Sequence, residues 1–208
     1  MRSDTNIIFL KIINFIFLLV ILTTPFIIIN YDVIYLKNNI PEQSLTEYTQ
    51  ELLLFGCSIS FAYLGMTQAL YRRCAFLIAG FFSCMLIREL DLFFDQLVFH
   101  GFWVYPASII ALITVIYASQ EREQTLSALA EFMKNNYFPI LCLGLGITLV
   151  YSRLFGMGSM WHQVLGHDYH RIVKNIAEES SELLGYVLMF YASINYVYSY
   201  FRHQTSNN

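Results

Sequence analysis

The sequence predicts an all-α protein, a polytopic integral membrane helix bundle with six transmembrane helices and with both termini on the inner side. Three observations support this fold class: the composition, a series of long uncharged stretches, and the distribution of Lys and Arg. Of the 208 residues, 57% are hydrophobic and 13% are charged, and the mean hydropathy is +0.52. Soluble domains carry roughly 25% charged residues, so this composition favours lipid as the main solvent.

Five uncharged stretches of 18 to 20 residues are each long enough to cross a hydrocarbon core of about 30 Å as a helix. A helix is the expected form because backbone in contact with lipid must satisfy its hydrogen bonds internally. A sixth span requires that the helix starting at Cys74 continues through the charged segment to about Phe99. The whole chain then forms one transmembrane domain, with spans at residues 12–29, 52–71, 74–99, 101–120, 135–152 and 180–201.

Basic residues set the expected orientation, because Lys and Arg are enriched in the cytoplasmic loops of membrane proteins. Seven of them fall on the side of the termini, four fall on the other side, and the turn "YRRC" at 71–74 is the strongest marker. Residues 96–104 and 155–177 are therefore expected outside. The abundance of Ile, Phe, Tyr and Asn favours a bacterial inner membrane, with the polar site facing the periplasmic side.

Several classes of function are disfavoured. The net charge of −3 argues against a nucleic-acid partner, which requires a basic face. We find no Gly-rich phosphate loop and no Walker pattern. The four cysteines contain no CxxC pair, which argues against both a disulfide framework and a thiolate metal site.

The segment "RELDLFFDQLVFH" at 88–100 carries charges into the predicted third span. At a rise of 1.5 Å per residue from Cys74, Arg88 lies roughly 21 Å across the membrane, Asp91 about 25 Å and Asp95 about 31 Å. These three residues share one helix face because they are spaced i, i+3 and i+7. Arg88 and Glu89 are expected to serve in structural ion pairs.

A second polar cluster, at 160–186, lies on the same expected outer side and contains three histidines followed by three glutamates. Counted back from Phe201, Glu182 lies roughly 28 Å from the inner face, near the depth of the two aspartates. Intramembrane charges pair with one another or with ions, and one Arg cannot neutralise all these carboxylates. We therefore predict a divalent transition metal; the mixed ligands favour zinc, with iron or manganese also possible. The predicted ligands are Asp91, Asp95, His167, His170 and Glu182, and Glu179 or Asp95 is the predicted general base.

Each of these residues also has a structural interpretation. Glu178 and Glu179 fit the first turn of a helix, where negative charge is favourable. His167 and His170 fit an exposed turn equally well, and the participation of His162 and His100 is left open.

Carboxylates and several histidines in a small polytopic protein resemble the membrane-embedded metal hydrolases such as the alkaline ceramidases. This chain has HxxH at 167–170 in place of their HxxxH pair and has fewer spans, so no residue role is carried over. The predicted function is a metal-dependent hydrolase that acts on a lipid or lipid-linked substrate at the outer leaflet. The alternatives are an ion- or proton-coupled transporter that uses the intramembrane carboxylates, or a non-catalytic membrane scaffold. Membrane lipids are the expected partners.

Overall fold

The computed structural model describes residues 2–37 and 43–207, and all regular secondary structure in this part of the chain is helical. The all-α prediction is therefore confirmed. Two of the segments are π-helical (η1 and η2) and one is a 3₁₀ helix (η3). The elements in chain order are α1 (Arg2–Asn30), η1 (Tyr31–Leu36), α2 (Leu45–Thr67), α3 (Arg72–Glu89), α4 (Asp91–Leu97), α5 (Val104–Ser119), α6 (Arg122–Lys134), α7 (Phe138–Gly146), η2 (Ile147–Tyr151), α8 (Ser152–Phe155), α9 (Gly158–Leu165), η3 (Gly166–Asp168) and α10 (Arg171–Asn207).

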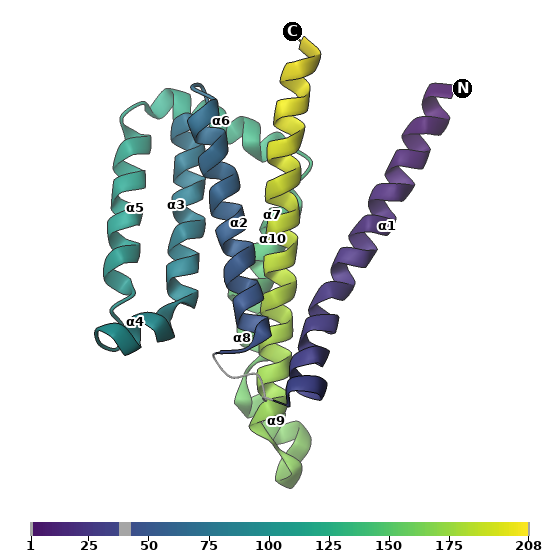
Figure 1. The fold of residues 1–208 in the computed structure, drawn as a ribbon, viewed down its shortest axis with the longest axis vertical. Helices are drawn as coiled ribbons and strands as arrows, with labels where there is room; N and C mark the ends of the chain where they lie inside the picture. Colours follow the sequence, from purple (N-terminus) through teal and green to yellow (C-terminus); the bar gives the residue numbers. More distant parts are fainter. Residues whose placement is uncertain (1, 38–42, 208) are drawn as a thin grey trace.

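The long helices run side by side, with α10 packed against α2 and α7, and α3 packed between α2 and α5 (Figure 1). Both ends of the chain lie at the same end of the bundle as α6, whereas α4 and α9 lie at the opposite end (Figure 1). The membrane sides expected for the termini and for the segments 96–104 and 155–177 stay predictions. The latter segment is more ordered than a loop, because it contains α9, η3 and the first turns of α10.

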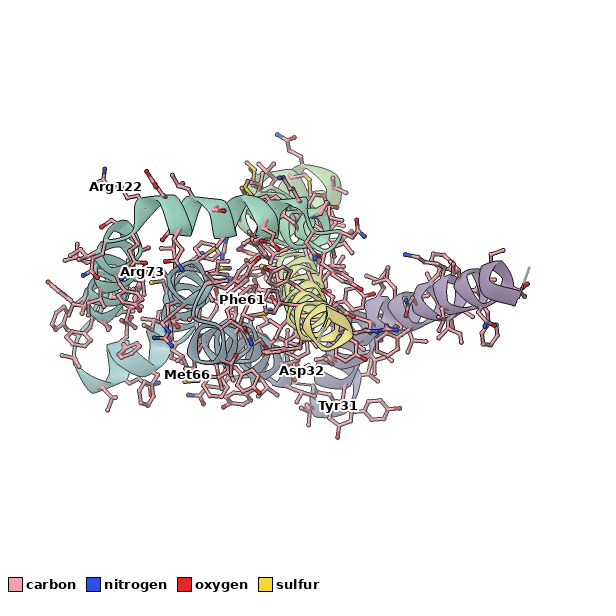
Figure 2. All side chains as sticks on the ribbon, turned by 90° about the horizontal axis from the view of Figure 1, so that it is seen from above. Tyr31, Asp32, Phe61, Met66, Arg73 and Arg122 are labelled. Atoms are coloured by element: carbon pink, nitrogen blue, oxygen red, sulfur yellow. The ribbon has the colours of Figure 1, made fainter. Side chains whose placement is uncertain are left out.

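The core forms where α2, α3 and α10 meet. Phe61 of α2 is fully buried, and its ring lies 6.0 Å from that of Phe82, 5.7 Å from that of Phe132 and 5.8 Å from that of Tyr196. Seen from above, Phe61 lies at the centre of the bundle, whereas α1 projects away from it (Figure 2). Stacked and edge-to-face rings of this kind bury large apolar areas, and here they join four helices, because Phe132 belongs to α6.

Close approach between α7 and α10 depends on two glycines. A Cβ atom on Gly144 would lie 2.7 Å from the backbone oxygen of Gly185, and a Cβ atom on Gly185 would clash with Thr148. Small residues at helix contacts allow backbones to approach closely in this way. The segment α7–η2–α8 therefore lies directly on α10.

Two helical segments of the described chain are long and apolar enough to cross a membrane: Thr5–Leu36, with a mean hydropathy of 2.7, and Phe138–Phe155, with a mean hydropathy of 1.7. A third candidate is α5 together with α6, which meet at a bend of 105°. Two or three spanning segments thus support membrane association, and the six-span arrangement stays a prediction.

The prediction of one helix through 74–99 is wrong. α3 ends at Glu89, and Leu90 takes φ −83° and ψ 20°, outside the helical region. α4 turns away from α3 toward the start of α5 (Figure 1). The break has a physical reason: a continuous helix would carry Asp91 and Asp95 along the apolar bundle, whereas the break places Asp91 in the first turn of α4, where the helix dipole favours a carboxylate.

Candidate functional site

Six glutamates of the described chain gather at the end of the bundle where α2 begins and α3 ends, and they act on one another by charge. Glu182 is buried, with 4% of its side chain exposed, and the other five are partly buried. We refer to them as the glutamate cluster, which consists of Glu47 and Glu51 from α2, Glu89 from α3, and Glu178, Glu179 and Glu182 from α10.

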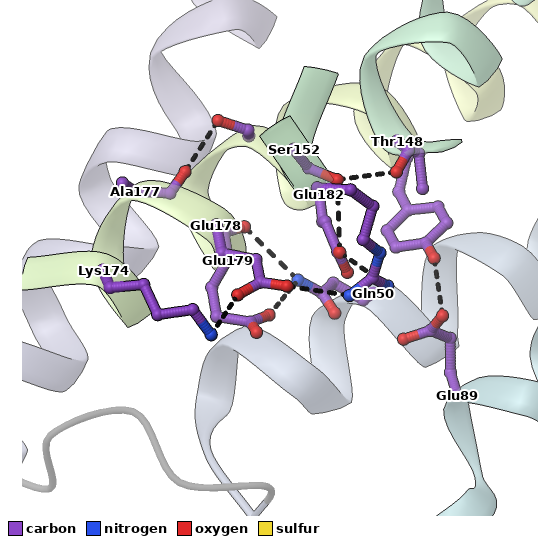
Figure 3. Close-up of polar contacts among 12 residues, drawn as sticks. Gln50, Glu89, Thr148, Ser152, Lys174, Ala177, Glu178, Glu179 and Glu182 are labelled. Atoms are coloured by element: carbon purple, nitrogen blue, oxygen red, sulfur yellow. Dashed lines mark hydrogen bonds and ion pairs between the residues drawn. The ribbon is translucent and has the colours of Figure 1, made fainter. Parts of the chain in front are cut away.

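Two basic side chains form ion pairs with two of the α10 glutamates, Glu178 and Glu182 (Figure 3). Arg153 Nη1 lies 2.8 Å from Glu178 Oε1, and Arg153 Nη2 lies 2.8 Å from Glu182 Oε1. Lys174 Nζ lies 2.9 Å from Glu178 Oε2, one helical turn away. The Arg153 guanidinium therefore bridges two carboxylates with separate nitrogens, a geometry that its planar fork allows.

The π-helical segment η2 precedes Arg153 and determines what faces α10. Ser152 follows η2 directly; its hydroxyl donates to the Thr148 carbonyl at 2.6 Å and lies 3.3 Å from Glu182 Oε1. π-helical turns insert an extra residue into a helix and are frequent at functional sites. Arg153 has 43% of its side chain exposed, so it forms the accessible edge of the cluster.

From α2, Gln50 and Glu47 reach toward α10. Gln50 is fully buried, and its amide Nε2 donates to Glu179 Oε2 at 3.2 Å and to the Glu179 backbone oxygen at 3.4 Å (Figure 3). Glu47 lies one turn earlier on α2, and its carboxyl group is in hydrogen-bond contact with that of Glu179. Two carboxyl groups in such contact must share a proton, because two like charges at this distance repel strongly.

Burial is the main cause of the raised pKa values of this pair. Burial and then the neighbouring Glu179 raise the pKa of Glu47. Burial also raises the pKa of Glu179, although hydrogen bonds from Gln50 and Glu47 oppose that change. Glu47 is therefore the proton donor of the pair and Glu179 the acceptor.

Glu89 is the member of the cluster that α3 contributes. Its Oε1 accepts a hydrogen bond from the Tyr186 hydroxyl at 2.8 Å, and Tyr186 is almost fully buried on α10. Arg88 and Arg153 are the nearest positive charges. The expected ion-pair role of Arg88 and Glu89 thus takes a different form here, since Glu89 bonds to a tyrosine of α10 and Arg88 acts on it through charge.

The sequence-predicted metal ligands do not come together in the described residues. Asp95 pairs with His100 Nδ1 and accepts a hydrogen bond from the Gly101 amide at 2.8 Å, at the corner between α4 and α5. The Asp95 carboxylate raises the pKa of His100. Asp91, His167 and His170 are exposed, and Glu182 pairs with Arg153 instead.

Within residues 2–37 and 43–207, no group of three or more His, Cys, Asp or Glu side chains is placed to hold a metal. The zinc-dependent hydrolase stays a prediction. Of its residues, the structure brings the predicted base Glu179 and the predicted ligand Glu182 into one cluster.

Sequence reasoning missed Glu47 and Glu51 of the cluster, and also Gln50 and Arg153, which contact it. A signal for them was present: "TEYTQE" directly precedes the uncharged stretch at 52–71, and Arg153 directly follows the stretch at 135–152. Both positions lie at the same expected membrane side and depth as Glu182. A search for polar residues at the outer ends of the predicted spans would have identified these residues as neighbours of Glu182.

No protein family, curated protein or solved structure matches this chain. Its function is therefore argued from the geometry of the glutamate cluster.

Proposed function

We propose that this chain is an integral membrane protein with six membrane-crossing segments that takes up and releases protons at the glutamate cluster, as an ion- or proton-coupled transporter. The two or three apolar spanning segments support the membrane location. The helices α2, α3 and α10 pack along these segments and contribute the acidic side chains. Ionisable groups inside a membrane bundle are costly, and proton relays in transporters and pumps are built from them.

The contact between Glu47 and Glu179 carries this proposal. The two carboxyl groups come from different helices and share a proton. Loss of that proton leaves two negative charges in direct contact, so the deprotonated state favours separation of α2 from α10. A ligand or proton shifts a conformational equilibrium by its differential affinity for the two states. Proton binding is thereby linked to the spacing of the two helices.

The composition of the cluster also supports exchange of positive charge. Among the described residues, six carboxyl groups stand against three nearby basic side chains, Arg88, Arg153 and Lys174. Full ionisation would leave excess negative charge in a buried site, so bound protons or cations must compensate it. Arg153, with 43% of its side chain exposed, is the accessible edge of the site, and its partner Glu182, with 4% exposed, extends the site inward.

The test is proton flux in liposomes that contain the purified full chain and a trapped pH indicator. An imposed membrane potential should drive proton entry faster than in protein-free liposomes, and Glu179→Gln should abolish the difference. Glu123→Gln is the matched control, because Glu123 is exposed on α6, far along the chain from the cluster. Flux equal to that of protein-free liposomes for the wild-type chain would overturn the proposal.

A further inference from the structure

Gln50 has an unsatisfied oxygen inside the glutamate cluster. The residue is fully buried, and its Oε1 has no hydrogen-bond partner in the described part of the chain. Buried polar atoms are nearly always paired, so an exception of this kind requires an explanation. The Nε2 atom of the same amide contacts the Glu179 carboxylate, so the unpartnered oxygen belongs to a side chain that packs against the glutamate cluster.

The orientation of the amide is determined by its neighbours. Nε2 lies within hydrogen-bond distance of two oxygens of Glu179, one from the carboxylate and one from the backbone. A flipped amide would place its oxygen against both of them, and neither can donate a proton. Oε1 therefore points to the remaining side of the amide as an acceptor that has no donor.

From these contacts we propose that Gln50 Oε1 and the carboxylates of Glu47 and Glu179 form a binding site for a monovalent alkali cation such as Na⁺. The cation replaces the proton that the two glutamates share. Glu47 and Gln50 are spaced i, i+3, so both project from one face of α2 toward α10. Carbonyl and carboxylate oxygens are the donor atoms that hard cations prefer.

The charge of the occupant follows from that of the proton it replaces. Exchange of one proton for one monovalent cation leaves the net charge of the buried site unchanged, whereas a divalent cation would add one unit. Ca²⁺ takes six to eight oxygens, and Mg²⁺ demands near-ideal octahedral geometry. Three side chains from two helices provide a smaller set. This inference rests on the proposed function, since it names the ion that the same site exchanges for protons.

The exchange depends on pH through all the charged groups that surround the site. These are Glu51 on α2, Glu89 and Arg88 on α3, Arg153 on α8, and Lys174, Glu178 and Glu182 on α10. Protons and the cation compete for the same carboxylates. The apparent dissociation constant for Na⁺ should therefore rise about tenfold for each unit by which the pH falls below the pKa of the glutamate pair.

The experiment is calorimetric titration of the purified full chain in detergent with NaCl at several pH values. Choline chloride, which is too large for the site, keeps the ionic strength constant. The expected result is saturable heat that weakens as the pH falls, is reduced at least tenfold in Gln50→Leu, and is lost in Glu47→Gln. Glu123→Gln should bind as the wild-type chain does.

Several results would overturn the inference. One is identical heat from choline and from Na⁺, which would indicate an effect of ionic strength. Others are tighter binding of Mg²⁺ or Ca²⁺ than of Na⁺, or unchanged Na⁺ binding in Glu47→Gln. That variant keeps the size of the side chain, so it decides the matter if Gln50→Leu does not fold. Absence of Na⁺ binding together with intact proton flux in liposomes would refute the cation site alone, because Gln50 Oε1 would then bind a buried water.

Discussion

Glu47 and Glu179 are the two residues on which the proposed proton exchange depends. Each is partly buried, and each belongs to a different helix. Burial disfavours the charged form of a carboxyl group, and a second carboxyl group adds to that effect. Their proton is consequently held at a pH where an exposed glutamate has lost it. The stability of the fold must then depend on pH.

We predict that the free energy of unfolding decreases as the pH rises above 4.5, the ordinary pKa of a glutamate. Above that pH the unfolded chain loses the Glu47 proton while the folded chain retains it, so the folded state binds more protons and is disfavoured by rising pH. The decrease is at most about 1.4 kcal/mol per pH unit for one proton. It ends once the pH passes the raised pKa.

Glu47→Gln should remove most of this pH dependence, because the amide donates to Glu179 without titrating. Thermal unfolding of the detergent-solubilised protein between pH 5 and pH 9 measures the effect, and the variant should be more stable than the wild-type chain at the alkaline end. A variant whose melting temperature follows that of the wild type at every pH would show that Glu47 and Glu179 do not share a proton.

Asp32 is a second buried acid, and its role is structural. Its carboxylate accepts hydrogen bonds from the Leu45 amide at 3.1 Å, the Thr46 amide at 2.8 Å and the Thr46 hydroxyl at 2.6 Å. Backbone amides in the first turn of a helix have no partner within the helix, and an acidic side chain satisfies them. Asp32 thereby fastens the end of α1 and η1 to the start of α2.

Asp32→Ala should destabilise the protein by about 2 kcal/mol, the upper part of the range for loss of a helix cap. Asp32→Asn should lose less, since one acceptor oxygen remains. Thermal unfolding at pH 7 measures both. Tyr35→Phe, on the exposed face of the same π-helical segment, is the control and should leave the melting temperature unchanged. An Ala variant as stable as this control would contradict the proposed role.

At the scale of the elements, the contact between α7–η2 and α10 decides where Arg153 lies. The contact is possible because Gly144 and Gly185 lack side chains. Thr148, which faces Gly185, is almost fully buried. An added methyl group would push the two backbones apart and move the Arg153 guanidinium away from Glu182.

Gly185→Ala should therefore cost about 3 kcal/mol of stability, within the range for overpacking, because the Gly144 carbonyl that it meets at 2.8 Å is backbone and cannot rotate away. Gly146→Ala is a matched control in the same helical segment, since nothing lies within 4 Å of the position that its methyl group would occupy. Removal of a helical glycine there should be neutral or stabilising by up to about 1 kcal/mol. Equal melting temperatures for the two variants would contradict the close contact.

At the scale of the whole molecule, the bundle has two distinct ends. One carries α6 and both termini, and the other carries α4 and α9 (Figure 1). The glutamate cluster lies toward the second end, where α2 begins and α3 ends. The excess of Lys and Arg at the first end favours a cytoplasmic location for it. With that orientation, which stays a prediction, the cluster is expected on the outer side.

Labelling of intact cells with a membrane-impermeant maleimide tests this orientation. In a background without the four native cysteines, Ser159→Cys on α9 should react from outside, and Ser127→Cys on α6 should react only after the cells are lysed. Both serines are exposed, so accessibility within the fold does not bias the comparison. Reaction of Ser127→Cys alone in intact cells would reverse the orientation, and reaction of both would refute a membrane between the two ends.

The sequence by itself determined the helical class, the apolar segments and the acidic character of residues 178–182. These properties depend on local composition and on hydrogen bonds within one turn, which the order of residues specifies directly. The charged segment after Arg88 was the exception. There a continuous helix and a helix that breaks at Leu90 have the same hydropathy, and the structure adopts the break.

Only the tertiary structure decided which acids meet. Gln50 and Glu179 are 129 residues apart in the chain, and their contact exists because α2 packs on α10. Asp95 lies on α4, where it pairs with His100 and accepts a hydrogen bond from the Gly101 amide. Depth along a membrane follows from counting residues, whereas the partner of a side chain follows from helix rotation and from packing between distant segments, which hydropathy does not record.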